Sequence, residues 1–152
     1  MKLYLAGSLF NEAEVNQRKK EGQILRKKFP QLEIFNPIDQ PFNEDKQTLP
    51  TPIEIFEGDT KAVEECDIFL CDVSNEDVGV AAELGIAIAT KTSIIIGYNT
   101  DIRLQSANQY DVPSYGMNHY ILGGLQKHGN LVFSFEEVCS LLEEKLQKNR
   151  GC

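Results

Sequence analysis

One acidic residue lies inside a stretch of the chain that is otherwise free of charge. From Val78 to Thr90 every residue is apolar or small except Glu83. Such a run predicts a helix that is buried on most sides, where a glutamate is almost never found without a partner. Removing a carboxylate from water raises its pKa and costs free energy. Glu83 is therefore the first candidate for a chemical role, the alternative being a side chain that points to solvent or pairs with a lysine.

Two more carboxylates precede Glu83 at positions where they can join it. Asp77 opens the same predicted helix, although an aspartate is also a favoured N-cap and needs no chemistry to explain it. Asp59 falls among the apolar positions of a second predicted helix, where an exposed flank is the alternative. Paired carboxylates suit glycosyl chemistry, in which one attacks or stabilises the anomeric carbon and another protonates the leaving group.

Several other chemistries lack the residues that they need. The chain has no GxGxxG turn after its first strand, no GxxxxGK[ST] loop and no GxSxG elbow. Its two histidines are too few for a histidine metal site, and its four cysteines show no zinc spacing. We therefore expect neither a metal nor a cofactor. Cysteines inside predicted strands and helices indicate buried, reduced thiols and a cytoplasmic protein.

The charge and the hydropathy pattern exclude two kinds of partner. The net charge is −8, whereas a nucleic-acid-binding protein normally presents a basic face. The basic residues of 18–20 and 26–28 are interpreted as the solvated face of one helix. No apolar stretch is long enough to span a membrane, and the N-terminus begins directly on a strand without a signal peptide. We therefore expect neither nucleic acid nor a membrane as a partner.

Strand and helix patterns alternate five times along the chain and place the three carboxylates. Strands are predicted at 2–6, 32–35, 67–73, 92–96 and 130–133, and helices at 12–29, from 52, from 78 to 90, at 117–125 and from 135. Ile53, Phe56, Thr60 and Val63 define the inward face of the second helix, and the polar loop 36–50 is a candidate lid or subunit contact. We predict one α/β domain over 1–152, a doubly wound five-stranded parallel sheet in the flavodoxin-like order 2-1-3-4-5.

The segment from Asp77 to Gly85 resembles the signature loop and helix of the nucleoside 2-deoxyribosyltransferases. The opening segment Leu3–Phe10 resembles the first strand and turn of that family, and Asp59 matches its active-site aspartate. The resemblance covers nearly the whole chain. It implies a retaining transfer of 2-deoxyribose between nucleobases in nucleoside salvage, with 2′-deoxynucleosides and free purine or pyrimidine bases as substrates.

The resemblance also assigns roles to individual residues. Glu83 would attack C1′ of the nucleoside to form a covalent deoxyribosyl ester, which a second base then resolves with ping-pong kinetics. Asp59 and Asp77 would hold the base and move its proton, and Tyr4 would orient Glu83. The substrate contacts expected from it are Gly7, Phe10, Gly79 and Asn118. From the residues alone, the favoured interpretation of Tyr4 and Phe10 is that both are core aromatic side chains.

Asn118 resembles an asparagine that family members contribute from a neighbouring subunit, which implies a homo-oligomer built on dimers, a hexamer among the options, with shared active sites. Its alternative is a polar residue at a helix N-terminus. Some family members place a C-terminal tyrosine and carboxylate in the site, whereas this chain ends in Lys148-Asn-Arg-Gly-Cys152. We expect Arg103 and the segment that follows it to compensate.

Three other functions remain as alternatives. A 2′-deoxynucleoside 5′-monophosphate N-glycosidase would share the fold and the glutamate, but it needs a serine and an arginine after the first strand. Here Ser8 is present and no arginine occurs before Arg18. A non-catalytic nucleotide-binding module would use Glu83 only to bind a ribose. A structural oligomer would use Glu83 in a salt bridge between subunits.

Overall fold

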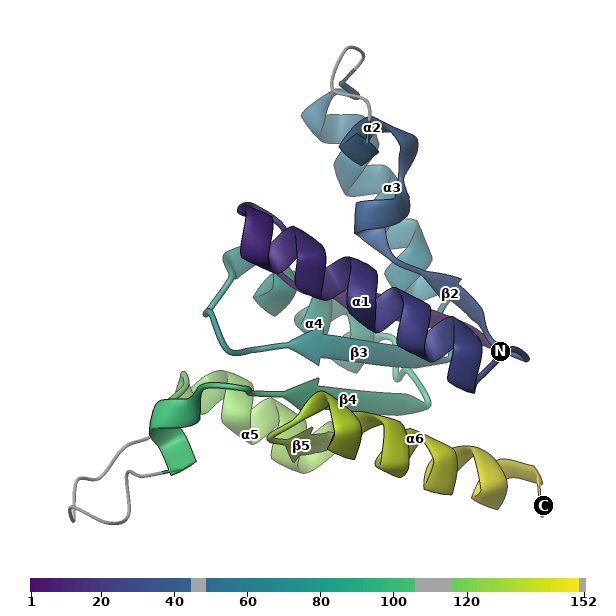
Figure 1. The fold of residues 1–152 in the computed structure, drawn as a ribbon, viewed down its shortest axis with the longest axis vertical. Helices are drawn as coiled ribbons and strands as arrows, with labels where there is room; N and C mark the ends of the chain where they lie inside the picture. Colours follow the sequence, from purple (N-terminus) through teal and green to yellow (C-terminus); the bar gives the residue numbers. More distant parts are fainter. Residues whose placement is uncertain (45–48, 106–115, 151–152) are drawn as a thin grey trace.

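Five parallel strands form one sheet at the centre of the molecule (Figure 1). The computed structural model describes residues 1–44, 49–105 and 116–150. The strands are β1 (Lys2–Ala6), β2 (Glu33–Phe35), β3 (Ile68–Asp72), β4 (Ile94–Tyr98) and β5 (Asn130–Val132), in the order β2-β1-β3-β4-β5. The predicted fold class and strand order are confirmed. The order reverses between β1 and β3, where an open α/β sheet forms its ligand crevice at the carboxyl ends of the strands.

Helices cover both faces of the sheet because the side chains of its strands alternate between two apolar cores. On one face α1 (Glu12–Lys28) and α6 (Phe135–Arg150) pack against Leu3, Leu5 and Leu70. On the other face α3 (Pro52–Glu64), α4 (Val78–Ala89) and α5 (His119–His128) pack against Tyr4 and Phe69. Figure 1 shows α1 and α6 together on the near side of the sheet. Tyr4 and α4 therefore share one face.

Helix caps fix the starts of the three helices on the second face. Thr51 and Glu54 form the predicted capping box of α3, with proline at the first helical position. The Asp77 carboxylate accepts the N–H groups of Gly79 and Val80 at the start of α4. Asn118 does the same for the first turn of α5. These caps satisfy N–H groups that a helix leaves without intrahelical partners.

The fourth strand and the fifth helix have other bounds than the sequence predicts. The fourth strand runs from Ile94 to Tyr98 rather than from 92 to 96, because Gly97 continues the strand instead of ending it. Leu125 packs over Gly97, where any Cβ would clash with it. Helix α5 continues past Gly123 and Gly124 to His128. Gly124 lies against Ile88 of α4, so packing outweighs the low helix propensity of glycine.

The loop from 36 to 50 is partly helical. It contains the 3-10 turn η1 (Pro37–Asp39) and the short helix α2 (Pro41–Glu44), while 45–48 lie outside the described residues. Figure 1 shows α2 and the start of α3 extending away from the sheet beyond β2. The proposed roles of this loop, a lid or a subunit contact, remain predictions.

The inward faces predicted for α3 and α4 were only partly right. Val63 is fully buried, but Ile53 and Phe56 are 67% and 66% exposed because the first two turns of α3 extend beyond the sheet. Helix α4 buries Val80, Leu84 and Ala87, whereas its outer positions, including Val78 and Ala82, are exposed. A helix on a sheet is covered on one side only, and no described helix covers the other side of α4.

The predicted solvated basic face of α1 was wrong for one residue. Arg18 is buried, although the other basic residues of 18–20 and 26–28 are exposed. Its guanidinium reaches the end of β3 and lies against Gly7, where a Cβ would sit 1.6 Å from Nη1. The glycine therefore leaves room for a buried cation, which a sequence pattern cannot reveal.

The described cysteines, Cys66, Cys71 and Cys139, are buried free thiols, as their places in predicted strands and helices indicate. Across the described ranges, no helix has both the length and the apolar character needed to cross a membrane.

Candidate active site

A hydrogen bond between β1 and α4 forms the centre of the candidate site. The Tyr4 hydroxyl donates to Oε1 of Glu83 over 2.7 Å, linking residues 79 positions apart in the chain. Tyr4 is fully buried and its ring stacks between Phe35 and Phe69. The stacked rings fix the hydroxyl, which in turn fixes one carboxylate oxygen of Glu83. Tyr4 is thus both a core aromatic residue and a partner of Glu83.

The surroundings of Glu83 favour the protonated, neutral form of its carboxyl group. Burial is the main cause that raises the pKa of Glu83 to about 7, with smaller contributions from the negative charges of Asp59 and Asp77 and against the lowering effect of the Tyr4 hydrogen bond. The same burial and the Glu83 charge raise the pKa of Tyr4, which therefore remains a donor. A carboxyl group with such a perturbed pKa is typical of functional sites.

Asp59 faces the Tyr4–Glu83 pair from α3. Its side chain is half-buried, and burial raises its pKa. Its charge acts on both Tyr4 and Glu83. Asp59 lies on the turn before Val63, the residue that anchors α3 to the sheet. The exposed-flank alternative for Asp59 is therefore wrong, because its side chain is half-buried and its charge reaches Tyr4 and Glu83.

Asp77 is held at both of its carboxylate oxygens. Oδ1 accepts the N–H of Gly79 over 2.7 Å and that of Val80 over 3.2 Å. Oδ2 accepts the hydroxyl of Ser8, which follows β1, over 2.8 Å. Asp77 is therefore the N-cap of α4 and also ties the first turn of that helix to the end of β1. Gly79 contributes its backbone to this cap and is itself exposed.

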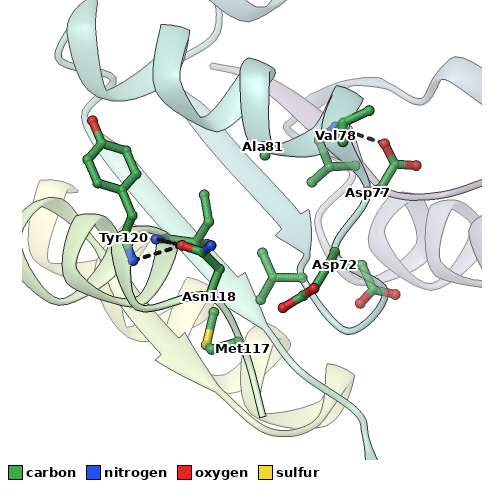
Figure 2. A pocket seen from close by; sticks show the side chains of 11 residues that line it. Asp72, Asp77, Val78, Ala81, Met117, Asn118 and Tyr120 are labelled. Carbon is green, nitrogen blue, oxygen red and sulfur yellow. Dashed lines mark hydrogen bonds between the residues drawn. The ribbon is translucent and has the colours of Figure 1, made fainter. Parts of the chain in front are cut away.

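A cavity of about 340 Å³ opens between the starts of α4 and α5 (Figure 2). Asp72 and Asp77 line it from the β3–α4 side, and Met117, Asn118 and Tyr120 line it from the α5 side. Figure 2 shows these groups on opposite walls, with Val78 and Ala81 between them. Glu83 does not line this cavity, because it leaves α4 on the side of Tyr4 and Asp59. The fold thus brings Asn118 to Asp77 but not to Glu83.

The remaining predicted contacts are distributed around this centre. Phe10 is 81% exposed, and its backbone N–H donates to Glu14. Arg103 lies near a separate cavity beside Glu14 and Glu76, where Asp101 binds its guanidinium through both carboxylate oxygens. These hydrogen bonds lower the pKa of Asp101 to about 2. Gly7 contacts the buried Arg18 rather than an open cavity.

The site contains residues that the sequence analysis did not select. Ser8 holds Asp77, Asp72 lines the cavity, and Tyr120 is 88% exposed at its rim. Ser8 directly follows Gly7, and Tyr120 lies two residues after Asn118. Their closeness in sequence to these two predicted substrate contacts was the only indication of their place in the site. Asp72 carried no such signal, because it is the last residue of an apolar strand.

The described residues offer no evident metal site. Across 1–44, 49–105 and 116–150, no three His, Cys, Asp or Glu side chains are grouped closely enough to hold an ion. Glu83 instead has the Tyr4 hydroxyl as its hydrogen-bond donor and the charges of Asp59 and Asp77 nearby. The arrangement suits chemistry at a carbon that accepts an oxygen nucleophile.

Comparison with known proteins finds one curated relative and solved structures that match nearly the whole chain. An uncharacterized protein, UU063 of Ureaplasma parvum serovar 3, is 30% identical, covering 97% of this chain and 98% of its own. A 2-deoxyribosyltransferase of Bacillus psychrosaccharolyticus superposes with a TM-score of 0.67 at 19% identity, covering 91% of this chain and 90% of its own. The CMP N-glycosidase BcmB of Clostridium botulinum superposes with a TM-score of 0.58 at 19% identity, covering 95% and 99%.

These two solved structures share the fold at identities that by themselves show nothing more. The family is shown by the model for nucleoside 2-deoxyribosyltransferases, which matches residues 3–140. That match includes β1 with Tyr4, helix α3 with Asp59, and the whole of α4. It supports glycosyl transfer or glycosidase activity as the general class of reaction. The chain is a member of the nucleoside 2-deoxyribosyltransferase family.

Proposed function

We propose that this protein transfers 2-deoxyribose between nucleobases through a covalent ester on Glu83. The observation that carries the proposal is the Tyr4–Glu83 hydrogen bond, which holds one carboxylate oxygen and leaves Oε2 to act as the nucleophile. The raised pKa of Glu83, about 7, shows that the site disfavours the charged carboxylate, so that conversion to a neutral ester is favourable. The substrates are a 2′-deoxynucleoside and a free purine or pyrimidine base.

The first half-reaction breaks the glycosidic bond of the donor nucleoside. Oε2 of Glu83 attacks C1′ as the bond from C1′ to the base nitrogen breaks, and its electron pair goes to the base. Asp59 donates the proton that the departing base takes up, a role supported by its half-buried carboxyl and raised pKa. Deoxyribose lacks the electron-withdrawing 2-hydroxyl group, so positioned carboxylates can stabilise the positive charge that develops at C1′.

The second half-reaction reverses these steps with a new base. A ring nitrogen of the acceptor base attacks C1′, the ester bond to Oε2 breaks, and Asp59 takes up the proton that the base loses. Two inversions at C1′ give net retention. Asp77, at the start of α4, holds the base. The product is a nucleoside, and Glu83 returns as a carboxylate.

We infer that a second copy of the chain completes the site. Two exposed surfaces support this inference. One is the uncovered outer side of α4, and the other is formed by Ile53 and Phe56, which precede Asp59 on α3. Ligand sites usually bury most of a ligand. Within one chain, Asn118 and Tyr120 lie on the side of α4 opposite Glu83, so they do not cover a ligand bound at Glu83. The partner would supply Asn118 to the sugar, in a dimer or an oligomer built from dimers. Buried free thiols fit a cytoplasmic site of action in nucleoside salvage.

Base exchange tests the proposal and separates it from its alternatives. The pure protein is incubated with 2′-deoxyinosine, with and without adenine, and the products are separated by chromatography. We expect deoxyadenosine only when adenine is present and none with Glu83→Ala. Equal release of hypoxanthine with and without adenine would show a hydrolase, in which water is the acceptor. No product from nucleosides or from deoxynucleoside 5′-monophosphates would leave the binding module or the structural oligomer.

A further inference from the structure

A buried ionic cluster lies on the face of the sheet opposite Glu83. It consists of Arg18, Glu21, Asp72 and Tyr98. Arg18 donates from Nη2 to Oδ2 of Asp72 over 2.7 Å and to Oε1 of Glu21 over 3.2 Å. Tyr98 donates to Oε2 of Glu21 over 3.0 Å, and its ring lies 5.9 Å from the guanidinium carbon. Arg18 and Glu21 are 2% and 0% exposed.

Filling the space beneath α1 with this ionic cluster costs free energy. Burying two charges costs several kcal/mol per ion, and apolar residues of similar volume often give an equally stable fold. The cluster also requires a glycine at position 7, because any Cβ there would overlap the Arg18 guanidinium. A purely structural role does not call for this arrangement, which indicates that the ionic cluster holds another part of the molecule in place.

The ionic cluster connects directly to the loop that carries Asp77. Oδ1 of Asp72, the oxygen not bound by Arg18, accepts the N–H of Ser74 over 3.0 Å and its hydroxyl over 2.5 Å. The Ser74 hydroxyl oxygen in turn accepts the N–H of Thr100 after β4 over 2.9 Å. Asp72 therefore fixes the first residues of the β3–α4 loop with one oxygen while Arg18 fixes Asp72 by the other.

The far end of the same loop is strained and is tied down separately. Glu76 adopts a φ of 51°, a left-handed conformation that costs about 1–3 kcal/mol for a residue other than glycine. The next residue, Asp77, is held by Ser8, which follows the Gly7 that Arg18 packs against. Arg18 thus touches both supports of the loop, the Asp72 carboxylate and the Gly7–Ser8 turn.

We propose that Arg18 is a positioning residue that sets Asp77 and the first turns of α4 from across the sheet, and that Gly7 serves to admit it. The proposal rests on the proposed function, since the reaction uses Glu83, which follows Asp77 on the same helix. It replaces a substrate contact as the role of Gly7. Without Arg18, the strained loop loses the anchor at Asp72, and Glu83 loses its alignment with Tyr4 and Asp59.

The test removes the buried charges as a pair and leaves Asp72 in place. Arg18→Met with Glu21→Gln takes away one positive and one negative charge, which limits the loss of stability. The matched control is Lys28→Met with Glu143→Gln, which removes an exposed ion pair between α1 and α6. The measurements are the melting temperature, kcat/KM for base exchange, and amide hydrogen exchange at Ser74, Gly79 and Val80.

We expect the Arg18/Glu21 variant to melt within a few degrees of the wild type, to lose at least tenfold in kcat/KM, and to exchange these amides at least tenfold faster. The control variant should match the wild type in all three. Wild-type amide exchange and kcat/KM in the Arg18/Glu21 variant would overturn the proposal. If the wild type shows no base exchange, the proposed function fails, and amide exchange still decides the role of Arg18.

A second variant tests the proposal if the Arg18/Glu21 variant does not fold. Gly7→Ala displaces the guanidinium without removing a charge, and it must show the same faster amide exchange.

Discussion

The Tyr4 hydroxyl donates a 2.7 Å hydrogen bond to Glu83 across the space between the first strand and the fourth helix. The bond lowers the pKa of this carboxyl group and opposes burial and two aspartates, and the net pKa of Glu83 is about 7. The nucleophile of the proposed reaction is the ionised form of Glu83. Changes around this pair should therefore move the pH dependence of the reaction in directions that the structure fixes.

Removing the Tyr4 hydroxyl should move the acid limb of the pH profile upward. Tyr4→Phe keeps the ring stacked between Phe35 and Phe69 but removes the hydrogen bond that favours ionised Glu83. The pKa of Glu83 should rise above about 7, and kcat/KM at pH 6 should fall more than at pH 8.5. Measuring kcat/KM from pH 5 to 9 checks this. An acid limb at the wild-type pH would show that Tyr4 does not control Glu83.

Removing the Asp59 charge should move the same limb the other way. Asp59 raises the pKa of Glu83 by charge repulsion, so Asp59→Asn should lower it. The maximum rate should nevertheless fall by about 10²–10⁴-fold, because the variant loses its proton donor. A pH series on this variant, with a base that departs without protonation as a second substrate, separates the two effects. Full activity with an ordinary base would rule out Asp59 as the acid.

Glu83 should reduce the stability of the fold at high pH. Its folded pKa of about 7 exceeds its ordinary value of 4.5, so stability present at low pH is lost as the pH rises through this interval. The loss is about 3 kcal/mol at 1.36 kcal/mol per pKa unit. Glu83→Gln, which still accepts from Tyr4, should be more stable than the wild type at pH 8 and similar at pH 4. Urea unfolding at both pH values measures this, and equal differences at the two would contradict it.

A charge on the exposed side of α3 should separate the subunits. Phe56 is 66% exposed next to Asp59, so Phe56→Asp should give a smaller species and lower kcat/KM because the partner's contribution is lost. The matched control is Phe133→Asp, since Phe133 is also exposed but lies at the opposite edge of the sheet. Light scattering after size-exclusion chromatography reports the mass. A wild type that is monomeric and active would rule out a shared site.

The sequence predicted those features that depend on local patterns. Alternating strands and helices, the capping box at Thr51 and the N-cap at Asp77 are all encoded within a few neighbouring residues. The outer part of α3 was misjudged because Ile53 and Phe56 have the right spacing for burial, whereas the sheet does not extend beneath them. Periodicity gives the direction of a side chain but not what lies opposite it.

The candidate site residues were chosen from the sequence, whereas the residues that support them became visible only in the folded structure. Glu83 stood out by its charge, whereas its partnership with Tyr4 depends on two elements 79 residues apart and came only from the family resemblance. Arg18 looked like an exposed basic residue because its neighbours on α1 are lysines. Its burial depends on space at Gly7 and an acceptor at Asp72, which only the folded chain brings together.

The most direct test of the account is detection of the covalent intermediate on Glu83. Wild-type protein is mixed with 2′-deoxyinosine without an acceptor base, quenched in acid within milliseconds, digested and analysed by mass spectrometry. We predict a peptide containing Glu83 that is heavier by one 2-deoxyribosyl group and that disappears when adenine is added before the quench. Release of hypoxanthine with no modified peptide, or modification of another residue, would contradict transfer through Glu83.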